Sequence, residues 1–188
     1  MRRLSSTVVV VVGDGATGVV AQLSGLRNVH AIVRGARSPA EVESLVAASS
    51  STYVVHEVDP LADVGDAWVE LFDGGGPVGR LEVAVEAAVA ALRGDRATLP
   101  DYYAVLDPDA LPVTRRHWWL GAVAGLAPSR VLPLPRPATA ATLTRELGRL
   151  PAGRWWPDDL ADRLRALPRT IPDRAGLTPQ PTHGTPAG

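Results

Sequence analysis

The chain of 188 residues contains no cysteine and no lysine, since all 19 of its basic residues are arginines. The absence of cysteine excludes disulfides, thiolate metal sites and a cysteine nucleophile. The absence of lysine excludes a Schiff base and a lysine that grips phosphate groups. The formal net charge is only −1, which differs from the strongly basic balance typical of nucleic-acid binding. We therefore expect no nucleic-acid partner.

Long apolar segments are also missing. No window of the sequence reaches the roughly 20 apolar residues that a membrane span needs. Arg2-Arg3 and the apolar run up to Val12 superficially resemble a signal peptide. That run is short and β-branched, however, and it leads into a glycine turn instead of a cleavage site. We therefore expect a cytoplasmic protein with no membrane partner.

What the sequence does contain is an alternation of short β-branched runs and longer helical patterns. Thr7–Val12 is continuously apolar, which predicts a central, buried strand. Ser38, Pro39 and Glu41 have the spacing of a helix N-terminus with a capping box. The predicted strands are Thr7–Val12, Val29–Val33, Thr52–Val55, Tyr102–Leu106 and Arg130–Leu134. One predicted helix begins at Ser38 and buries Val42, Leu45 and Val46, and the others cover about 17–26, 63–72, 77–93, 113–125, 138–150 and 157–167.

Five strands separated by helices imply right-handed crossovers and a mainly parallel sheet covered on both faces. We therefore predict an α/β three-layer sandwich with a mainly parallel five-stranded sheet, of P-loop-like or Rossmann-like type. A single domain is expected over residues 1–167. Residues 168–188 are rich in Pro, Thr, Gly and Arg, which predicts a disordered tail.

The most informative stretch follows the first strand, where a strand, a glycine turn and a helix form the unit that binds phosphates in such folds. Its glycines match both the dinucleotide fingerprint GxGxxG and the first part of a Walker A loop. An unliganded structural turn explains the same glycines, because strand–turn–helix units need them for backbone reasons alone. The candidate ligand-binding residues here are Gly13, Asp14, Gly15, Ala16, Thr17 and Gly18.

The stretch "VVVGDGATG" resembles the first motif of small GTPases, within the class of P-loop NTPases. The resemblance implies a nucleotide held by the loop. That family continues with lysine and then Ser or Thr, where this chain has Val19 and Val20. Without the lysine charge and the hydroxyl that holds Mg²⁺, hydrolysis by the usual route is not expected. The resemblance thus describes a degenerate Walker A loop and a pseudoenzyme.

Gly15-Ala16-Thr17-Gly18 also resembles the turn of NmrA-like atypical short-chain dehydrogenases, a Rossmann family. In that resemblance Arg34, at the end of the second strand, holds the 2′-phosphate of NADP. The Tyr-x-x-x-Lys pair of short-chain dehydrogenases is missing, because the chain has no lysine. The cofactor thus stays open between a nucleotide and NADP.

Acidic residues follow three of the predicted strands: Asp14 the first, Glu57 and Asp59 the third, and Asp107 and Asp109 the fourth. Because ligands in open α/β sheets bind beyond the carboxyl ends of the strands, these acids have two interpretations. They converge to bind a metal or to transfer protons, or they only form turns. We include Asp59 among the ligand-binding candidates and predict no metal site. His56, beside these acids, is interpreted as structural.

Two tryptophan pairs are candidates for contact with a protein partner. Trp118 and Trp119 follow an arginine pair in a predicted helix, and Trp155 and Trp156 precede the last predicted helix. Tryptophan is enriched at interfaces, although burial in the core explains the same residues.

Three functions follow from these patterns. The first is a non-hydrolysing module that binds a nucleotide or a protein partner on a degenerate P-loop-like core. The second is an NADP-dependent oxidoreductase of atypical short-chain dehydrogenase type. The third is a structural or assembly subunit without a ligand. No residue is assigned a catalytic role.

Overall fold

The structure is a computed structural model, and it describes residues 6–127, 129–151 and 156–169. The strands are β1 (Thr7–Val12), β2 (Val29–Ile32), β3 (Tyr53–His56), β4 (Tyr102–Leu106) and β5 (Val131–Leu134). The helices are α1 (Ala16–Gln22), α2 (Pro39–Ala48), α3 (Ala62–Phe72), α4 (Val78–Arg93), α5 (Val113–His117), α6 (Ala124–Leu126), α7 (Ala140–Leu147) and α8 (Leu160–Ala166). A 3₁₀ turn, η1 (Pro108–Ala110), precedes α5, and a π-helical segment, η2 (Trp118–Val123), joins α5 to α6.

All five strands are parallel and lie in the order β2-β3-β1-β4-β5. This confirms the predicted α/β class and the central position of β1. The order differs from the usual Rossmann order, in which the second strand lies beside the first. Here β3 lies between β1 and β2, so the end of β2 is two strands away from the glycine turn.

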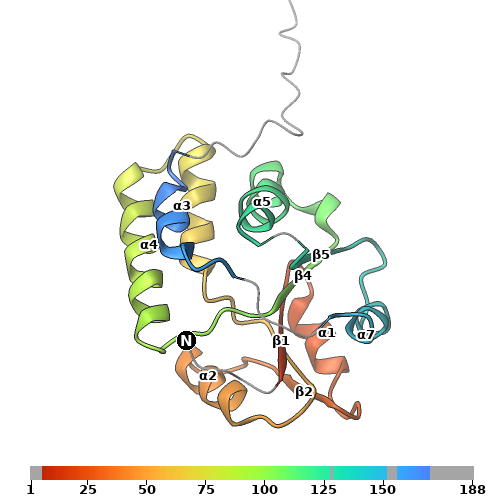
Figure 1. Ribbon diagram of the computed structural model, residues 1–188. Helices are drawn as coiled ribbons and strands as arrows, with labels where there is room; N and C mark the ends of the chain where they lie inside the picture. The colour runs from red at the N-terminus through yellow and green to blue at the C-terminus, as the bar shows by residue number, and fades with distance from the viewer. Residues whose placement is uncertain (1–5, 128, 152–155, 170–188) are drawn as a thin grey trace, which may run out of the picture.

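Alternate valines of β1 face opposite layers of the molecule. Val9 and Val11 pack with α1 and α7 on one face of the sheet. Val10 and Val12 pack with α3, α4, η2 and α8 on the other face, and Val8 packs with α2 on that same side. Figure 1 shows α1 and α7 on one side of the sheet, and α2, α3 and α4 on the other. The result is a three-layer sandwich in which β1 is buried from both sides.

The predicted helix start at Ser38 is confirmed. The Ser38 hydroxyl accepts a hydrogen bond from the Glu41 N–H, and the Glu41 side chain accepts one from the Ser38 N–H. The predicted helix over 113–125 is also present, but its middle part is π-helical. Helix α1 ends four residues before the predicted position, in a turn where Gly25 has a φ of 92°.

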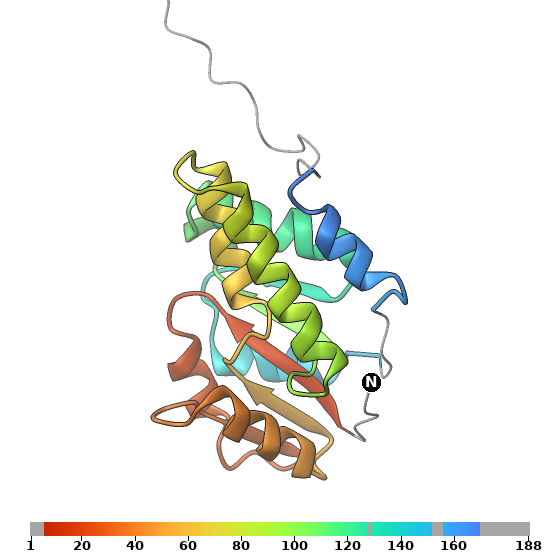
Figure 2. The ribbon, with the colours of Figure 1, turned by 90° about the vertical axis from the view of Figure 1, so that its left-hand side faces the viewer.

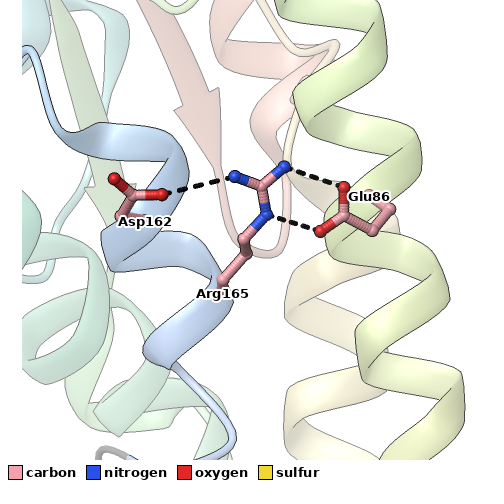
Figure 3. A network of polar contacts seen from close by, with 3 residues as sticks. All are labelled: Glu86, Asp162 and Arg165. Carbon is pink, nitrogen blue, oxygen red and sulfur yellow. Dashed lines mark hydrogen bonds and ion pairs between the residues drawn. The ribbon is translucent and has the colours of Figure 1, made fainter.

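Helix α8 returns to the α4 face of the sheet, as Figure 2 shows. Its apolar side chains Leu160 and Leu164 are buried in the core. On the outside, the Arg165 guanidinium forms a two-point contact with the Glu86 carboxylate at 2.6 and 3.0 Å (Figure 3). A further nitrogen lies 3.3 Å from the Asp162 carboxylate. Because exposed ion pairs add little stability, we attribute the docking of α8 mainly to its apolar contacts. Residues 170–188 of the predicted tail lie outside the described residues.

Candidate functional site

The glycine turn after β1 is short. Gly13 has a φ of 105°, and a Cβ atom there would lie 2.8 Å from the Leu106 carbonyl oxygen, so glycine is required. Gly15 has a φ of 81° and forms the N-cap of α1, which begins at Ala16. Gly18 therefore lies inside the first turn of the helix, with open space around its Cα. The turn spans only Gly13–Gly15.

Val19 and Val20 occupy the positions at which a P-loop protein carries lysine and Ser or Thr. Val19 is 8% exposed and Val20 is fully buried, and both pack in the core between α1 and the sheet. These side chains therefore do not face a ligand at the turn. In this helix the two positions belong to the core.

A crevice of about 460 Å³ lies at the carboxyl ends of β1, β3 and β4. Helix α1, after β1, covers one face of the sheet, whereas the helices after β3 and β4 cover the other. The crevice is thus at the topological switch point of the sheet, where open α/β proteins bind their ligands. Its walls combine Gly13 and Asp14 with Glu57 and Asp59, and with residues of the segment that follows β4.

The charged residues that line the crevice are mostly acidic. Among the described residues there, four carry a carboxylate and one carries a guanidinium. The guanidinium of Arg115 lies 2.5 Å from the Asp66 carboxylate, so this cation is already paired. The carboxylates that remain are Asp14, Glu57 and Asp59.

Asp59 is partly buried, and its Oδ1 accepts two hydrogen bonds. The donors are the Leu61 N–H at 2.8 Å and the Tyr103 hydroxyl at 2.9 Å. Burial raises the pKa of the Asp59 carboxyl from 3.8 to about 6, although both hydrogen bonds favour the carboxylate. Tyr103 is fully buried, and its burial raises the pKa of its hydroxyl well above 10. Tyr103 therefore acts as a hydrogen-bond donor that orients Asp59.

Glu57 lies at the end of β3, directly beside the glycine turn. Its Oε1 accepts a hydrogen bond from the Arg34 backbone N–H at 2.7 Å. Its Oε2 is buried and has no hydrogen-bond partner within the described part of the chain. An unpaired buried carboxylate oxygen is costly, and the Glu57 residue lines both the crevice and the neighbouring cavity described next.

A second cavity of about 460 Å³ lies on the other side of the Glu57–Asp59 segment, between α2 and α4. Arg34 and Arg96 line it, together with Glu43 and Asp63. His56 also lines it; burial lowers the pKa of this imidazole to about 4, and its Nδ1 accepts a hydrogen bond from the Val58 N–H. His56 is therefore neutral near pH 7, in agreement with a structural role.

The predicted ligand-binding residues are divided between these two places. Gly13, Asp14 and Ala16 line the crevice, and Asp59 lines both spaces. Arg34 lines the second cavity, because β3 separates β2 from the glycine turn. Three predicted residues line neither space: Gly15, Thr17 and Gly18.

Asp107 and Asp109, the acids after β4, also lie outside the crevice. Asp107 pairs with Arg136, and Asp109 lies 3.5 Å from Arg116. Asp107 has a φ of 45° and begins the η1 turn, which agrees with the turn interpretation of these residues. Among the described residues, no group of three or more acidic or histidine side chains could hold a metal ion.

The proposed partner surface on the first tryptophan pair is wrong. Trp118 is fully buried against Trp68, and Trp119 is 4% exposed against Tyr103. Helix packing on the sheet places both side chains in the core, in agreement with the alternative interpretation of this pair. Trp156 is partly buried and donates its indole N–H to the Pro100 carbonyl oxygen at 2.7 Å. Trp155 lies outside the described residues.

Sequence reasoning missed three contributors to the crevice. Trp119 lines it and packs at a tilt against Tyr103 with the ring centroids 5.0 Å apart, and the Tyr103 hydroxyl donates to Asp59. The ion pair between Arg115 and Asp66 joins α5 to α3. The position of Tyr103 within a continuously apolar strand was the available signal, since a buried tyrosine hydroxyl needs a polar partner.

The fold and the crevice define an α/β protein with an all-parallel sheet and a candidate ligand site at its switch point. Comparisons with protein-family models, with curated proteins and with solved structures found no match to this chain. Within the described ranges, no helix has the length and apolar character needed to cross a membrane.

Proposed function

We propose that the protein is a non-hydrolysing binding module that holds a nucleotide-type ligand, a base on ribose with or without phosphates, in the switch-point crevice. The observation that carries this proposal is the convergence of the turns after β1, β3 and β4 on one space of about 460 Å³. That volume lies within the range of small-molecule sites. A glycine turn after the first strand is also where α/β folds hold nucleotides.

The energetics of Asp59 support a ligand site. A carboxyl whose pKa rises to about 6 by burial costs stability at neutral pH, because its charged form is poorly solvated. The charge of Arg115 lowers this pKa and offsets only part of the cost, and Arg115 is itself paired with Asp66. Perturbed carboxyl groups in a cleft occur preferentially at functional sites, where stability is lost for the sake of binding or chemistry.

The same geometry argues against NTP hydrolysis. The chain has no lysine, and the positions that bind phosphate and Mg²⁺ in P-loop proteins are the core residues Val19 and Val20. The strand order differs from the usual Rossmann order, which weakens the Rossmann resemblance. The separation of Arg34 from the glycine turn also weakens the NADP alternative.

Thermal unfolding with a panel of ligands tests the proposal. The panel contains ATP, GTP and NADPH, each with and without Mg²⁺, together with the four common ribonucleosides. A ligand present at 100 times its Kd adds about 2.7 kcal/mol of stability, which raises Tm by about 5–10 °C in a chain of this size. We expect such a shift with at least one ligand, and its loss in Asp14→Asn/Asp59→Asn.

The control is Asp63→Asn, which removes a carboxylate that lines the second cavity and not the crevice. The control should keep the shift. If no ligand of the panel shifts Tm, the proposal is wrong and a structural or partner-binding role remains. If the double variant keeps the full shift, the ligand binds elsewhere. A shift with NADPH alone would favour the oxidoreductase hypothesis.

A further inference from the structure

We propose that the second cavity, between α2 and α4, binds a small zwitterion, namely an α-amino acid with an apolar side chain. The donors to its carboxylate are Arg34, Arg96 and His56. Asp63 accepts its ammonium group. Although Glu57 and Asp59 line both spaces, this inference does not rest on the ligand proposed for the crevice.

His56 provides the cavity with a buried hydrogen-bond donor. In β3, Val54 packs against α2 and Val55 packs on the opposite face, so the alternation of the strand directs His56 to the α2 side, where the cavity lies. Its Nδ1 accepts the Val58 N–H at 3.2 Å, which leaves the proton of the neutral ring on Nε2. The residue is 5% exposed, and Nε2 forms no hydrogen bond within the described part of the chain, yet it is not sealed from solvent. The His56 Nε2–H is therefore a donor open to the cavity.

Arg34 and Arg96 bring two positive charges to the same cavity. Arg34 follows β2 and Arg96 follows α4, so the fold brings them together. Among the described residues, neither guanidinium has a hydrogen-bond or ion-pair partner. One exposed arginine needs no partner, but two of them on a cavity with a buried N–H donor form a recognition set for an oxyanion. A carboxylate suits this set, because it accepts two parallel N–H bonds from a guanidinium.

The acidic residues of the cavity determine the net charge that a ligand can have. Four of them line it beside the two arginines: Glu43, Glu57, Asp59 and Asp63. Since carboxyl groups outnumber guanidiniums, the cavity disfavours a ligand with a net negative charge. A phosphate monoester, with close to two negative charges at pH 7, is such a ligand. A ligand with one charge of each sign can pair with both kinds of group.

Asp63 is the acidic residue that is available to an ammonium group. The other three each accept at least one hydrogen bond from the protein. Asp63 is exposed in the first turn of α3, and its carboxylate has no hydrogen-bond or ion-pair partner in the residues that the structure describes.

The rest of the lining consists mainly of small apolar residues. They include Pro39 and Val42 from α2, Val58 and Pro60 from the segment after β3, and Ala91 from α4. The volume of about 460 Å³ is within the range of small-molecule sites. No tryptophan, tyrosine or phenylalanine is among the described residues of this lining, so it offers a nucleobase no aromatic surface. An aliphatic side chain fits it better.

Isothermal titration calorimetry on the full chain tests the inference. The probes are the twenty common amino acids and inorganic phosphate. For each amino acid that binds, the series adds its N-acetyl derivative, which lacks the ammonium charge, and its carboxamide, which lacks the carboxylate. We expect at least one apolar amino acid to bind, with both derivatives at least tenfold weaker and phosphate weaker still.

An N-acetyl derivative that binds as tightly as the amino acid would overturn the inference, because the site would then recognise only the carboxylate. Phosphate that binds more tightly than any amino acid would overturn it as well. If no amino acid binds, the inference is wrong. The nucleotide panel is unaffected by these outcomes, because it reports on the crevice.

Variants of the charged residues place the ligand. Arg34→Gln/Arg96→Gln should lower amino-acid affinity at least tenfold, while the backbone N–H of residue 34 still reaches Glu57. Asp63→Asn should lower it to a similar extent. The control is Arg27→Gln, at an exposed arginine after α1 that lines neither space, and it should stay within twofold of the wild type. Wild-type affinity in the arginine and aspartate variants would show that the ligand binds elsewhere and overturn the inference.

His56→Asn tests the buried donor. Asparagine can still accept the Val58 N–H, but it has no counterpart of Nε2–H. We expect amino-acid affinity to fall at least tenfold, and unchanged affinity would overturn the role of His56. Circular dichroism checks the folding of each variant. If His56→Asn unfolds, the variants at the exposed positions 34, 63 and 96 decide the question.

Discussion

Replacement of Asp59 by asparagine should make the protein more stable at neutral pH while it impairs the crevice. The asparagine oxygen can accept the same two hydrogen bonds, from the Leu61 N–H and the Tyr103 hydroxyl, that the carboxylate accepts. What the substitution removes is the negative charge. The variant therefore isolates the cost of an ionised carboxylate at this partly buried position.

The size of the effect follows from the pKa of Asp59, which burial raises from 3.8 to about 6 in the folded protein. A difference of this size corresponds to about 3 kcal/mol of folding free energy. The folded state binds the proton more tightly than the unfolded state does. This contribution to stability is therefore fully present below pH 3.8 and is lost as the pH rises through 6. Asp59→Asn behaves like the protonated form at every pH.

Urea unfolding of the wild type and of Asp59→Asn, measured between pH 4 and pH 8, tests this reasoning. We expect the two proteins to have nearly equal stability at pH 4. At pH 8 the variant should be more stable by up to about 3 kcal/mol, and the difference should develop mainly between pH 4 and pH 6. Asp63→Asn, at an exposed position in the first turn of α3, should change stability by less than about 1 kcal/mol. A difference that is independent of pH, or a variant less stable than the wild type at pH 8, would refute the argument.

Three further predictions concern the turn, the buried histidine and α8. Gly13→Ala should destabilise the fold by about 2–4 kcal/mol, because its Cβ would meet the Leu106 carbonyl oxygen at positive φ. Gly18→Ala, in open space within α1, should stabilise the fold by about 0.5–1 kcal/mol. Equal urea unfolding midpoints for Gly13→Ala and Gly18→Ala would contradict the assignment of the turn to Gly13–Gly15. Burial lowers the pKa of His56 to about 4, so this side chain should cost the folded protein about 3 kcal/mol as the pH falls from 6.5 to 4, and the gain from Asp59 opposes that loss over the same range. His56→Asn should lose less over the same range, and equal losses in unfolding experiments would exclude His56 as the cause. Leu164→Ala should cost about 2–5 kcal/mol, because this leucine is fully buried. Arg165→Gln, at an exposed ion pair, should move the unfolding midpoint far less; the opposite ranking would show that the ion pair holds α8.

Much of the fold could be predicted from the sequence, because the signals for its elements are local. Five consecutive valines are compatible with a strand buried on both faces, and β1 has the predicted limits. The capping box of Ser38 and Glu41 acts within one turn of helix, and it forms as predicted. The end of α1 was less predictable, because helix termination depends on the packing of the following turn as well as on the glycine.

The site was predictable only in part. The glycines and Asp59 could be found in the sequence, since turns and strand ends carry characteristic residues. The sequence could not show that Arg34 lines a different cavity, because its position depends on the insertion of β3 between β1 and β2. The pairing of Arg115 with Asp66 likewise depends on how α5 meets α3.

The sequence by itself determined the class of the fold, its elements and the absence of lysine chemistry, because composition and hydrophobic period act along the chain. Only the tertiary structure decided the order of the strands and the direction of each side chain. It buried Val19, Val20 and Trp118, and it brought Asp14, Glu57 and Asp59 to one crevice. The physical reason is that burial and charge depend on neighbours that are distant in sequence, whereas strands and helix caps depend on neighbours along the chain.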